Sequence, residues 1–247
     1  MASRLRELVK LLLRGGKVAT APLSYAQDGL YVQHNAPFLS DERFVNAYAH
    51  GKSTGSWGAA NIQWRAHVAC WAADQVKTLP GDFIEFGVNK GGLAQTIIDY
   101  LKFAELGKNY YLLDTFNGLD DALISDAERS VGRDQITYYT DCYQEVMARF
   151  GPYPFARVIR GSVPSTLKQV DASAFCFVSM DMNCAEPELA ALEFCWPKLV
   201  PGGVIVLDDY GFRTHEAQQN VHRKFAQHQG VPLLELPTGQ GLIMKPR

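Results

Sequence analysis

Three aspartates, at positions 181, 208 and 209, are the residues of this sequence best suited to chemistry. Asp181 follows the apolar run Phe175–Ser179, and Asp208 and Asp209 follow Val204–Leu207. If these runs are neighbouring strands, about 4.8 Å apart, the three carboxylates converge at one edge of the sheet. Crowded carboxylates need a neutralising cation, and all-oxygen ligands suit Mg²⁺, or alternatively Mn²⁺ or Ca²⁺. Such a site could polarise a substrate hydroxyl, with Asp181 as the base. The alternative is that these acids cap helices or pair with a lysine.

A glycine-rich turn lies earlier in the chain, after an apolar run that begins at Phe83. It reads Glu-Phe-Gly-Val-Asn-Lys-Gly-Gly over residues 85–92, which matches neither a P-loop nor Gly-x-Gly-x-x-Gly. A pyrophosphate cofactor is therefore disfavoured, and the turn suits a small zwitterionic group held by backbone N–H groups and a helix N-terminus. The candidate cofactor-binding residues are Glu85, Gly87, Asn89 and Gly91. The alternative is a tight turn with a structural role only.

An acidic residue, Asp114, ends the next apolar run, Tyr110–Asp114. Its distance from the glycine turn, some 20 to 30 positions, places it to accept hydrogen bonds from a ribose diol. Together, the turn and the acid indicate a cofactor that contains adenosine. A helix-capping role is the alternative for Asp114. Ser162, which follows the apolar run Ala156–Arg160, is a further cofactor-binding candidate.

Two histidines are alternative general bases. His67 lies in a predicted helix, and His215 closely follows the Asp208–Asp209 pair. A lone histidine is more often a packed or surface residue than a catalytic one, so both are weaker candidates than Asp181.

The elements that must position these residues alternate along the chain. Near-continuous apolar runs are typical of parallel strands covered on both faces, and here they alternate with helical patterns. The predicted strands are Phe83–Val88, Tyr110–Asp114, Ala156–Arg160, Phe175–Ser179 and Val204–Leu207. The predicted helices are 61–76, with Trp64, Val68, Trp71 and Ala72 on one stripe, then 92–103, 165–170, 186–196 and 215–228.

The C-terminus carries two further strand-like runs, Pro232–Leu236 and Gly241–Met244. The gap between them is too short for a parallel crossover and predicts a hairpin. We therefore expect an α/β fold with a doubly wound, Rossmann-like sheet of about seven strands, one of them antiparallel. This ending is typical of class I S-adenosylmethionine methyltransferases and not of NAD-binding Rossmann domains.

Three segments complete the expected organisation. Residues 1–63 form an N-terminal extension, irregular over 17–55, that covers the pocket or a subunit interface, so a homo-oligomer is one expectation. Its first 16 residues form a basic amphipathic helix, expected to pack on its own domain or on a partner subunit, and a membrane-surface helix is the alternative. Lys10 interrupts the only candidate secretory signal. The methyltransferase domain spans 64–247, with a substrate-facing insertion near 117–153 that contains one or two helices.

Composition excludes several classes of protein. With 24 basic and 26 acidic side chains the formal net charge is −2, which argues against binding nucleic acid. No run approaches the 18 or so apolar residues needed to span a membrane. The five cysteines form no Cys-x-x-Cys pair and several lie in apolar runs, so they predict reduced thiols and a cytoplasmic protein.

At several of these segments the chain resembles the macrocin O-methyltransferase (TylF-type) family, from roughly Trp64 to the C-terminus. The resemblance rests on Gln63–Ala72, Gly81–Gly91, Leu113–Gly118, Asp181 and Leu199–Tyr210. It implies a class I fold that uses S-adenosylmethionine and a divalent metal, held by Asp181, Asp208 and Asp209, to methylate sugar hydroxyls. It also implies that the Glu85–Gly91 turn and Asp114 contact the cofactor and that Asp181 is the base. Many members have Asp-x-Asp-x-Tyr after the first metal ligand, whereas this chain has Asp181-Met-Asn-Cys-Ala185.

The predicted function is therefore Mg²⁺- and S-adenosylmethionine-dependent O-methylation of a sugar hydroxyl in a glycoside or polysaccharide precursor. One alternative is a metal-dependent methyltransferase of a catechol or other phenol. The other is a protein that binds S-adenosylmethionine without turnover, which three crowded carboxylates disfavour.

Overall fold

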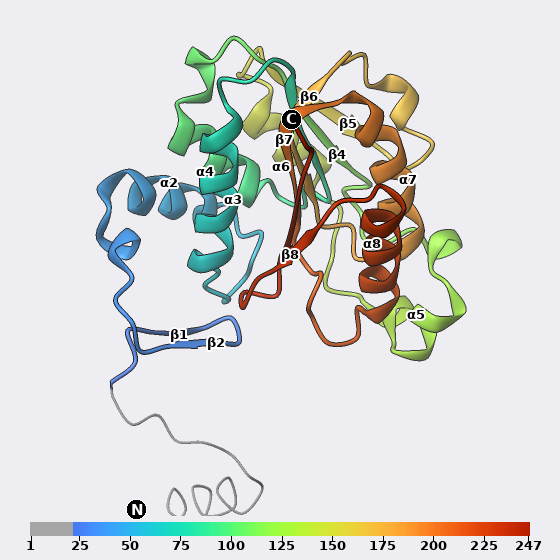
Figure 1. The fold of residues 1–247 in the computed structure, drawn as a ribbon, viewed down its shortest axis with the longest axis horizontal. Coiled ribbons are helices and arrows are strands. Elements are labelled where there is room, and N and C mark those ends of the chain that lie inside the picture. The colour runs from blue at the N-terminus through green and yellow to red at the C-terminus, as the bar shows by residue number, and fades with distance from the viewer. Residues whose placement is uncertain (1–21) are drawn as a thin grey trace, which may run out of the picture.

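A seven-stranded sheet forms the centre of the computed structural model, which describes residues 22–247 (Figure 1). The strand order is β5-β4-β3-β6-β7-β9-β8. The strands are β3 (Asp82–Phe86), β4 (Tyr110–Asp114), β5 (Ala156–Arg160), β6 (Phe175–Met180), β7 (Leu199–Leu207), β8 (Leu233–Glu235) and β9 (Gly241–Met244). Strands β3 to β7 pair in parallel, whereas β9 runs antiparallel to both β7 and β8. The predicted α/β sheet, closed by a C-terminal hairpin with one antiparallel strand, is confirmed.

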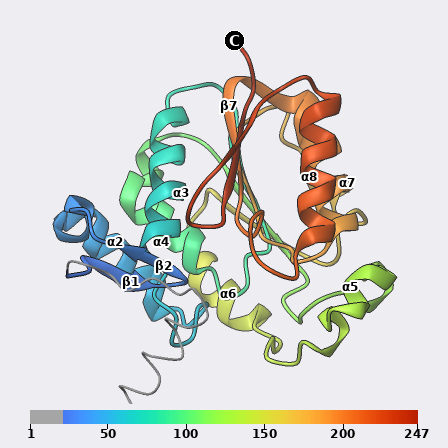
Figure 2. The ribbon, with the colours of Figure 1, turned by 60° about the horizontal axis from the view of Figure 1, so that its bottom comes forward.

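Helices cover both faces of this sheet, because its central strands are apolar on both sides. The helices are α2 (Glu42–Ser53), α3 (Gln63–Val76), α4 (Gly92–Leu101), α5 (Asp126–Ser130), α6 (Tyr143–Phe150), α7 (Ala185–Cys195) and α8 (Glu216–His228). Helices α3 and α4 lie on one face and α7 and α8 on the other (Figure 2). Each face has its own apolar core, and every residue of β6 is buried. Burial on both faces explains why these strands read as continuous apolar runs.

The region expected to be irregular, residues 17–55, contains regular elements in its described part. Strands β1 (Tyr25–Gln27) and β2 (Leu30–Val32) form a hairpin, and helix α2 follows. The Asp41 carboxylate caps this helix by accepting the Phe44 N–H at 2.8 Å. Its buried residues, Phe44, Ala47, Tyr48 and Gly51, have helical spacing. The expectation was therefore wrong here, whereas the predicted basic helix of residues 1–16 lies outside the described residues.

Two other local predictions were wrong. The predicted helix over 165–170 is only a 3₁₀ turn, Leu167–Gln169, because its N–H groups bond to carbonyl groups three residues back, as Val170 does to Leu167. In α3 only Ala72 of the predicted apolar stripe is fully buried, whereas Trp64 and Val68 are half-buried and Trp71 is 48% exposed. The helix instead buries small side chains, including Ala66, Ala69 and Ala73, which let it approach the sheet closely.

The insertion near 117–153 contains α5, α6 and two 3₁₀ turns. A capping box joins Ser125 to Glu128 at the start of α5. The second Glu128 carboxylate oxygen accepts the Ala185 N–H at 2.7 Å, which connects the insertion to the first residue of α7. Among the described residues, no helix combines the length and apolar character needed to cross a bilayer.

Candidate active site

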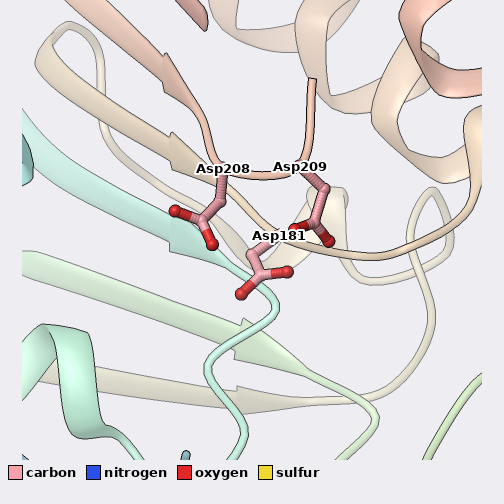
Figure 3. A group of neighbouring side chains, drawn as sticks. All are labelled: Asp181, Asp208 and Asp209. Carbon is pink, nitrogen blue, oxygen red and sulfur yellow. The ribbon is translucent and has the colours of Figure 1, made fainter. Parts of the chain in front are cut away.

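The three predicted metal ligands converge beyond the ends of β6 and β7. Met180 is the register partner of Leu207, so the residues that follow them in the chain emerge side by side. One carboxylate oxygen from each of Asp181, Asp208 and Asp209 lies within 4.8 Å of the others (Figure 3). Three carboxylate oxygens are a donor set that suits a hard divalent cation such as Mg²⁺, Mn²⁺ or Ca²⁺.

Burial and mutual repulsion perturb these acids unequally. Burial and the nearby charges of Asp209 and Asp208 raise the pKa of Asp181 well above its usual value. Burial also raises the pKa of Asp208, although the Arg65 charge opposes the shift. For Asp209, burial acts in the same direction but is outweighed by the hydrogen bond from His215 and by neighbouring positive charges, so its pKa is lowered. The cluster therefore needs positive charge to hold all three acids ionised.

Arg65, on α3, supplies part of that charge and was missed in the sequence. Its Nη1 donates to Oδ2 of Asp208 and lies 3.9 Å from Oδ1 of Asp209. Its Nε donates to Oδ2 of Asp28, in the β1–β2 turn, at 2.7 Å. The available signal was an arginine within an otherwise small and apolar helical stretch, but Arg65 and Asp208 are 143 residues apart.

A single cavity of about 640 Å³ joins the glycine turn to the acids. Its lining includes the predicted residues Glu85, Gly87, Asn89, Asp114, Ser162, Asp181, Asp209 and His215. Asp208 lies behind this lining, where its Oδ1 accepts the Gln240 Nε2–H at 2.9 Å. Residues of the N-terminal extension, among them Ser56 and Trp57, also line the cavity.

The predicted residues at the glycine turn differ in their roles: most line the cavity, whereas Gly91 is needed for packing. Asp114 accepts the backbone N–H groups of Asn89 at 2.7 Å and of Phe116 at 2.5 Å, which orients its carboxylate. Gly91 does not line the cavity, and a Cβ there would lie 2.3 Å from the Phe150 ring, so its glycine is explained by packing. A Cβ on Gly87 would lie 1.8 Å from the Asp181 carbonyl oxygen.

The sequence match is consistent with this geometry. The family model of macrocin O-methyltransferases (TylF) matches residues 60–235, which include the glycine turn and all three aspartates. The chain belongs to the macrocin O-methyltransferase family.

Individual relatives agree with that membership. A curated relative from Streptomyces olivaceus, 8-demethyl-8-(2,3-dimethoxy-α-L-rhamnosyl)-tetracenomycin-C 4′-O-methyltransferase, is 25% identical over 142 residues. The match covers 53% of this chain and 54% of the relative, so the chain spans about half the length of that protein.

Two solved structures show the same fold. The O-methyltransferase NovP has a TM-score of 0.66 at 19% identity, over 74% of this chain and 80% of NovP. The calicheamicin methyltransferase CalS11 has a TM-score of 0.56 at 18% identity, over 92% and 99%. The predicted class I methyltransferase fold is thereby confirmed.

Asn183, where many members of the macrocin O-methyltransferase family have an acid, is hydrogen-bonded within the site. Its Nδ2 donates to Oδ1 of Asp181 at 3.0 Å, and its Oδ1 faces Nε2 of His215 and Nη1 of Arg133 at 3.3 and 3.4 Å. The amide thus orients the Asp181 carboxylate without adding a negative charge. Arg133, buried in the insertion, was also missed in the sequence.

The two candidate histidines lie in different places. His215 lines the cavity, with Nε2 3.3 Å from Oδ2 of Asp209 and Nδ1 3.1 Å from the Arg213 carbonyl oxygen. His67 lies outside the cavity lining, stacked on Phe38 with ring centroids 4.0 Å apart. The structure therefore brings His215 to the acids and leaves His67 in an aromatic cluster.

Glu85 is buried beside the cavity, and its carboxylate accepts a hydrogen bond from the Tyr110 hydroxyl at 2.7 Å. Burial raises its pKa from 4.5 to about 8, and the nearby charges of Asp208 and Asp114 add to the shift. A carboxyl whose pKa is higher in the folded state contributes stability that is full below pH 4.5 and is lost as the pH rises towards 8.

We therefore expect Glu85→Gln to reduce the loss of stability between pH 5 and pH 8.5 by roughly 3 kcal/mol, since a glutamine has no proton to lose. The measurement is the free energy of unfolding in urea at both pH values. The exposed Glu193→Gln is the matched control and should follow the wild type. Parallel pH profiles of wild type and Glu85→Gln would contradict the prediction.

Proposed function

We propose that the protein is a divalent-cation- and S-adenosylmethionine-dependent O-methyltransferase that acts on a sugar hydroxyl of a glycoside or polysaccharide precursor. The observation that carries the proposal is the single cavity that joins Asp114 and the glycine turn to the three aspartates. A cofactor at the first two strand ends and an acceptor at the acids would then lie in the same cavity.

A sugar acceptor is supported by what the relatives are called. The Streptomyces olivaceus relative is described as methylating a rhamnosyl group at its 4′-oxygen, and CalS11 as a TDP-rhamnose 3′-O-methyltransferase. Use of S-adenosylmethionine is supported by related folds with bound cofactor, including TomG from Streptomyces achromogenes at a TM-score of 0.53.

The residues of this chain have separate tasks in such a reaction. When bound, S-adenosylmethionine would supply the methyl group and the cation would lower the pKa of the acceptor hydroxyl. Asp114 would accept hydrogen bonds from the ribose diol, and Asp181, oriented by Asn183, would take the hydroxyl proton. Displacement at the methyl carbon would release the demethylated cofactor, so the cavity walls would have to hold the donor methyl group and the acceptor oxygen in line.

The direct test is transfer of an isotope-labelled methyl group from S-adenosylmethionine to panels of glycosides, nucleotide sugars and phenols. We expect the labelled methyl group to appear on the sugar hydroxyls of glycosides or nucleotide sugars. Transfer only to phenols would favour the catechol-type alternative, and cofactor binding without transfer to any acceptor would favour a non-catalytic binder.

Asp114→Ala should weaken S-adenosylmethionine binding by about 1–3 kcal/mol, because polar partners would be left unpaired. Calorimetric titration with S-adenosylmethionine and with NAD is the measurement, and Asp74→Ala, at the contact of α3 with α2 and outside the cavity lining, is the control. An affinity equal to that of the wild type would remove Asp114 from the cofactor site. Binding of NAD alone would refute the choice of cofactor.

The N-terminal extension (1–63) is proposed to close the cavity over domain 64–247. The Ser56 hydroxyl accepts the Gly92 N–H at 2.8 Å, and the Asn89 amide donates to the Ser56 carbonyl at 3.0 Å. These bonds connect the extension to the glycine turn and support a lid role.

A cytoplasmic location is supported by the five cysteines, all buried and unpaired.

A further inference from the structure

Arg65 is placed between the N-terminal hairpin and the acid cluster, with a different carboxylate on each side. Its Nε and Nη2 donate to the two oxygens of Asp28 at 2.7 and 3.2 Å. Its Nη1 points the other way, to Oδ2 of Asp208. The Arg65 side chain is only 14% exposed, so both ion pairs are shielded from water.

The local structure keeps each partner of Arg65 in place. Asp28 and Gly29 form the β1–β2 turn with φ of 54° and 73°, the left-handed values of a tight hairpin. The Tyr25 hydroxyl anchors this hairpin by donating to the Asn61 carbonyl at 3.0 Å. On the other side, Nε2 of Gln240 donates to Oδ1 of Asp208 at 2.9 Å and to the Arg65 carbonyl at 3.3 Å. Asp208 is thereby held facing the guanidinium.

We propose that the Asp28–Arg65 pair sets the divalent-cation affinity of the acid cluster. Arg65 competes with a bound cation for the charge of Asp208, and Asp28 weakens that competition by sharing the guanidinium. This inference rests on the proposed metal site. It assigns the β1–β2 hairpin, through Asp28, a role in setting the metal affinity of that site.

Changes to the two partners therefore have opposite effects on metal affinity. Arg65→Gln removes a positive charge next to the cluster, so Mn²⁺ and Mg²⁺ should bind about tenfold more tightly or better. Asp28→Asn keeps the size of the side chain but removes its negative charge, so the whole Arg65 charge acts on Asp208. That variant should bind either cation roughly three- to tenfold more weakly.

The experiment is titration of the full-length, metal-free protein with Mn²⁺ by electron paramagnetic resonance and with Mg²⁺ by calorimetry. Arg65→Lys keeps the positive charge but loses the guanidinium group that donates to both Asp28 and Asp208. Its metal affinity should therefore stay closer to that of the wild type than the affinity of Arg65→Gln. The Arg43–Asp74 pair joins α2 to α3 at 2.9 Å and offers matched controls. Arg43→Gln and Asp74→Asn should leave metal affinity unchanged.

The outcomes separate this inference from the proposed function. Opposite shifts in Arg65→Gln and Asp28→Asn support it, and if Arg65→Gln does not fold, weakening in Asp28→Asn carries the test. Wild-type binding of Mn²⁺ with no shift, or with shifts of the same sign, overturns the inference and leaves the metal site intact. Absence of Mn²⁺ binding in wild type and in every variant refutes the metal site and the inference together, while methyl transfer to a sugar would still stand on its own assay.

Discussion

Removal of divalent cations should abolish methyl transfer while cofactor affinity stays nearly unchanged. The reason is spatial: the three aspartates lie beyond β6 and β7, whereas Asp114 and the glycine turn lie at the ends of β4 and β3. The acceptor hydroxyl would then lose the positive charge that stabilises its oxygen as the proton leaves. The measurement is labelled methyl transfer in excess EDTA, followed by addition of Mg²⁺, Mn²⁺ or Ca²⁺ in separate reactions.

Calorimetric binding of S-adenosylhomocysteine in the same buffers is the control for this experiment. It should give similar affinities with and without EDTA, because the cofactor site contains none of the three acids. Full methyl transfer in excess chelator would show that the aspartates are structural, and His215 would become the leading candidate for the base.

Substitution of the acids themselves should lower turnover strongly. Asp208→Asn should reduce kcat on the order of 100-fold or more, through weaker metal binding and lost charge. Asp181→Asn should be at least as severe, since Asp181 is proposed both as a ligand and as the base. Steady-state methyl transfer at saturating Mg²⁺ measures both effects.

A matched control exists at the other end of the same strand. Asp171 precedes β6, at the end of the strand away from the acids, and accepts a hydrogen bond from the Tyr111 hydroxyl. Asp171→Asn should keep near wild-type turnover, and an equal loss in all three variants would indicate a general effect on folding. Near wild-type activity of Asp208→Asn would exclude that carboxylate from the reaction.

The sheet could be predicted because its signal is local. A parallel strand buried on both faces is apolar along most of its length, so the sequence at Tyr110–Asp114 predicted that strand with its observed bounds. The edge strand Ala156–Arg160, in which only Ile159 is fully buried, was also predicted with its observed bounds, from a shorter apolar signal. Strand ends then located the acids, because parallel neighbours finish at the same edge. The convergence of Asp181 with Asp208 and Asp209 followed from that rule together with the assumption that the two strands are neighbours, which the pairing of β6 with β7 confirms.

Other features depend on contacts that no local pattern encodes. Helix α2 is polar apart from a narrow stripe, which the capping residue Asp41 and the spacing from Phe44 to Gly51 could have indicated. In α3 the large side chain of Trp71 faces outward because the helix packs through its alanines, so a stripe of large residues was misleading. The role of Arg65 could not be predicted, because both of its partners are distant in the chain.

Gly87 has a consequence for redesign of this protein. Its backbone passes so close to the Asp181 carbonyl that no side chain fits between them, and the Asp181 N–H donates to Phe86 at 2.9 Å. If the cofactor lies at Gly87 and the acceptor at Asp181, as proposed, the distance between them is fixed by two main chains in contact. Attempts to broaden the range of acceptors should therefore change the insertion, several of whose residues between 117 and 140 line the cavity, and leave the contact between Gly87 and Asp181 unchanged.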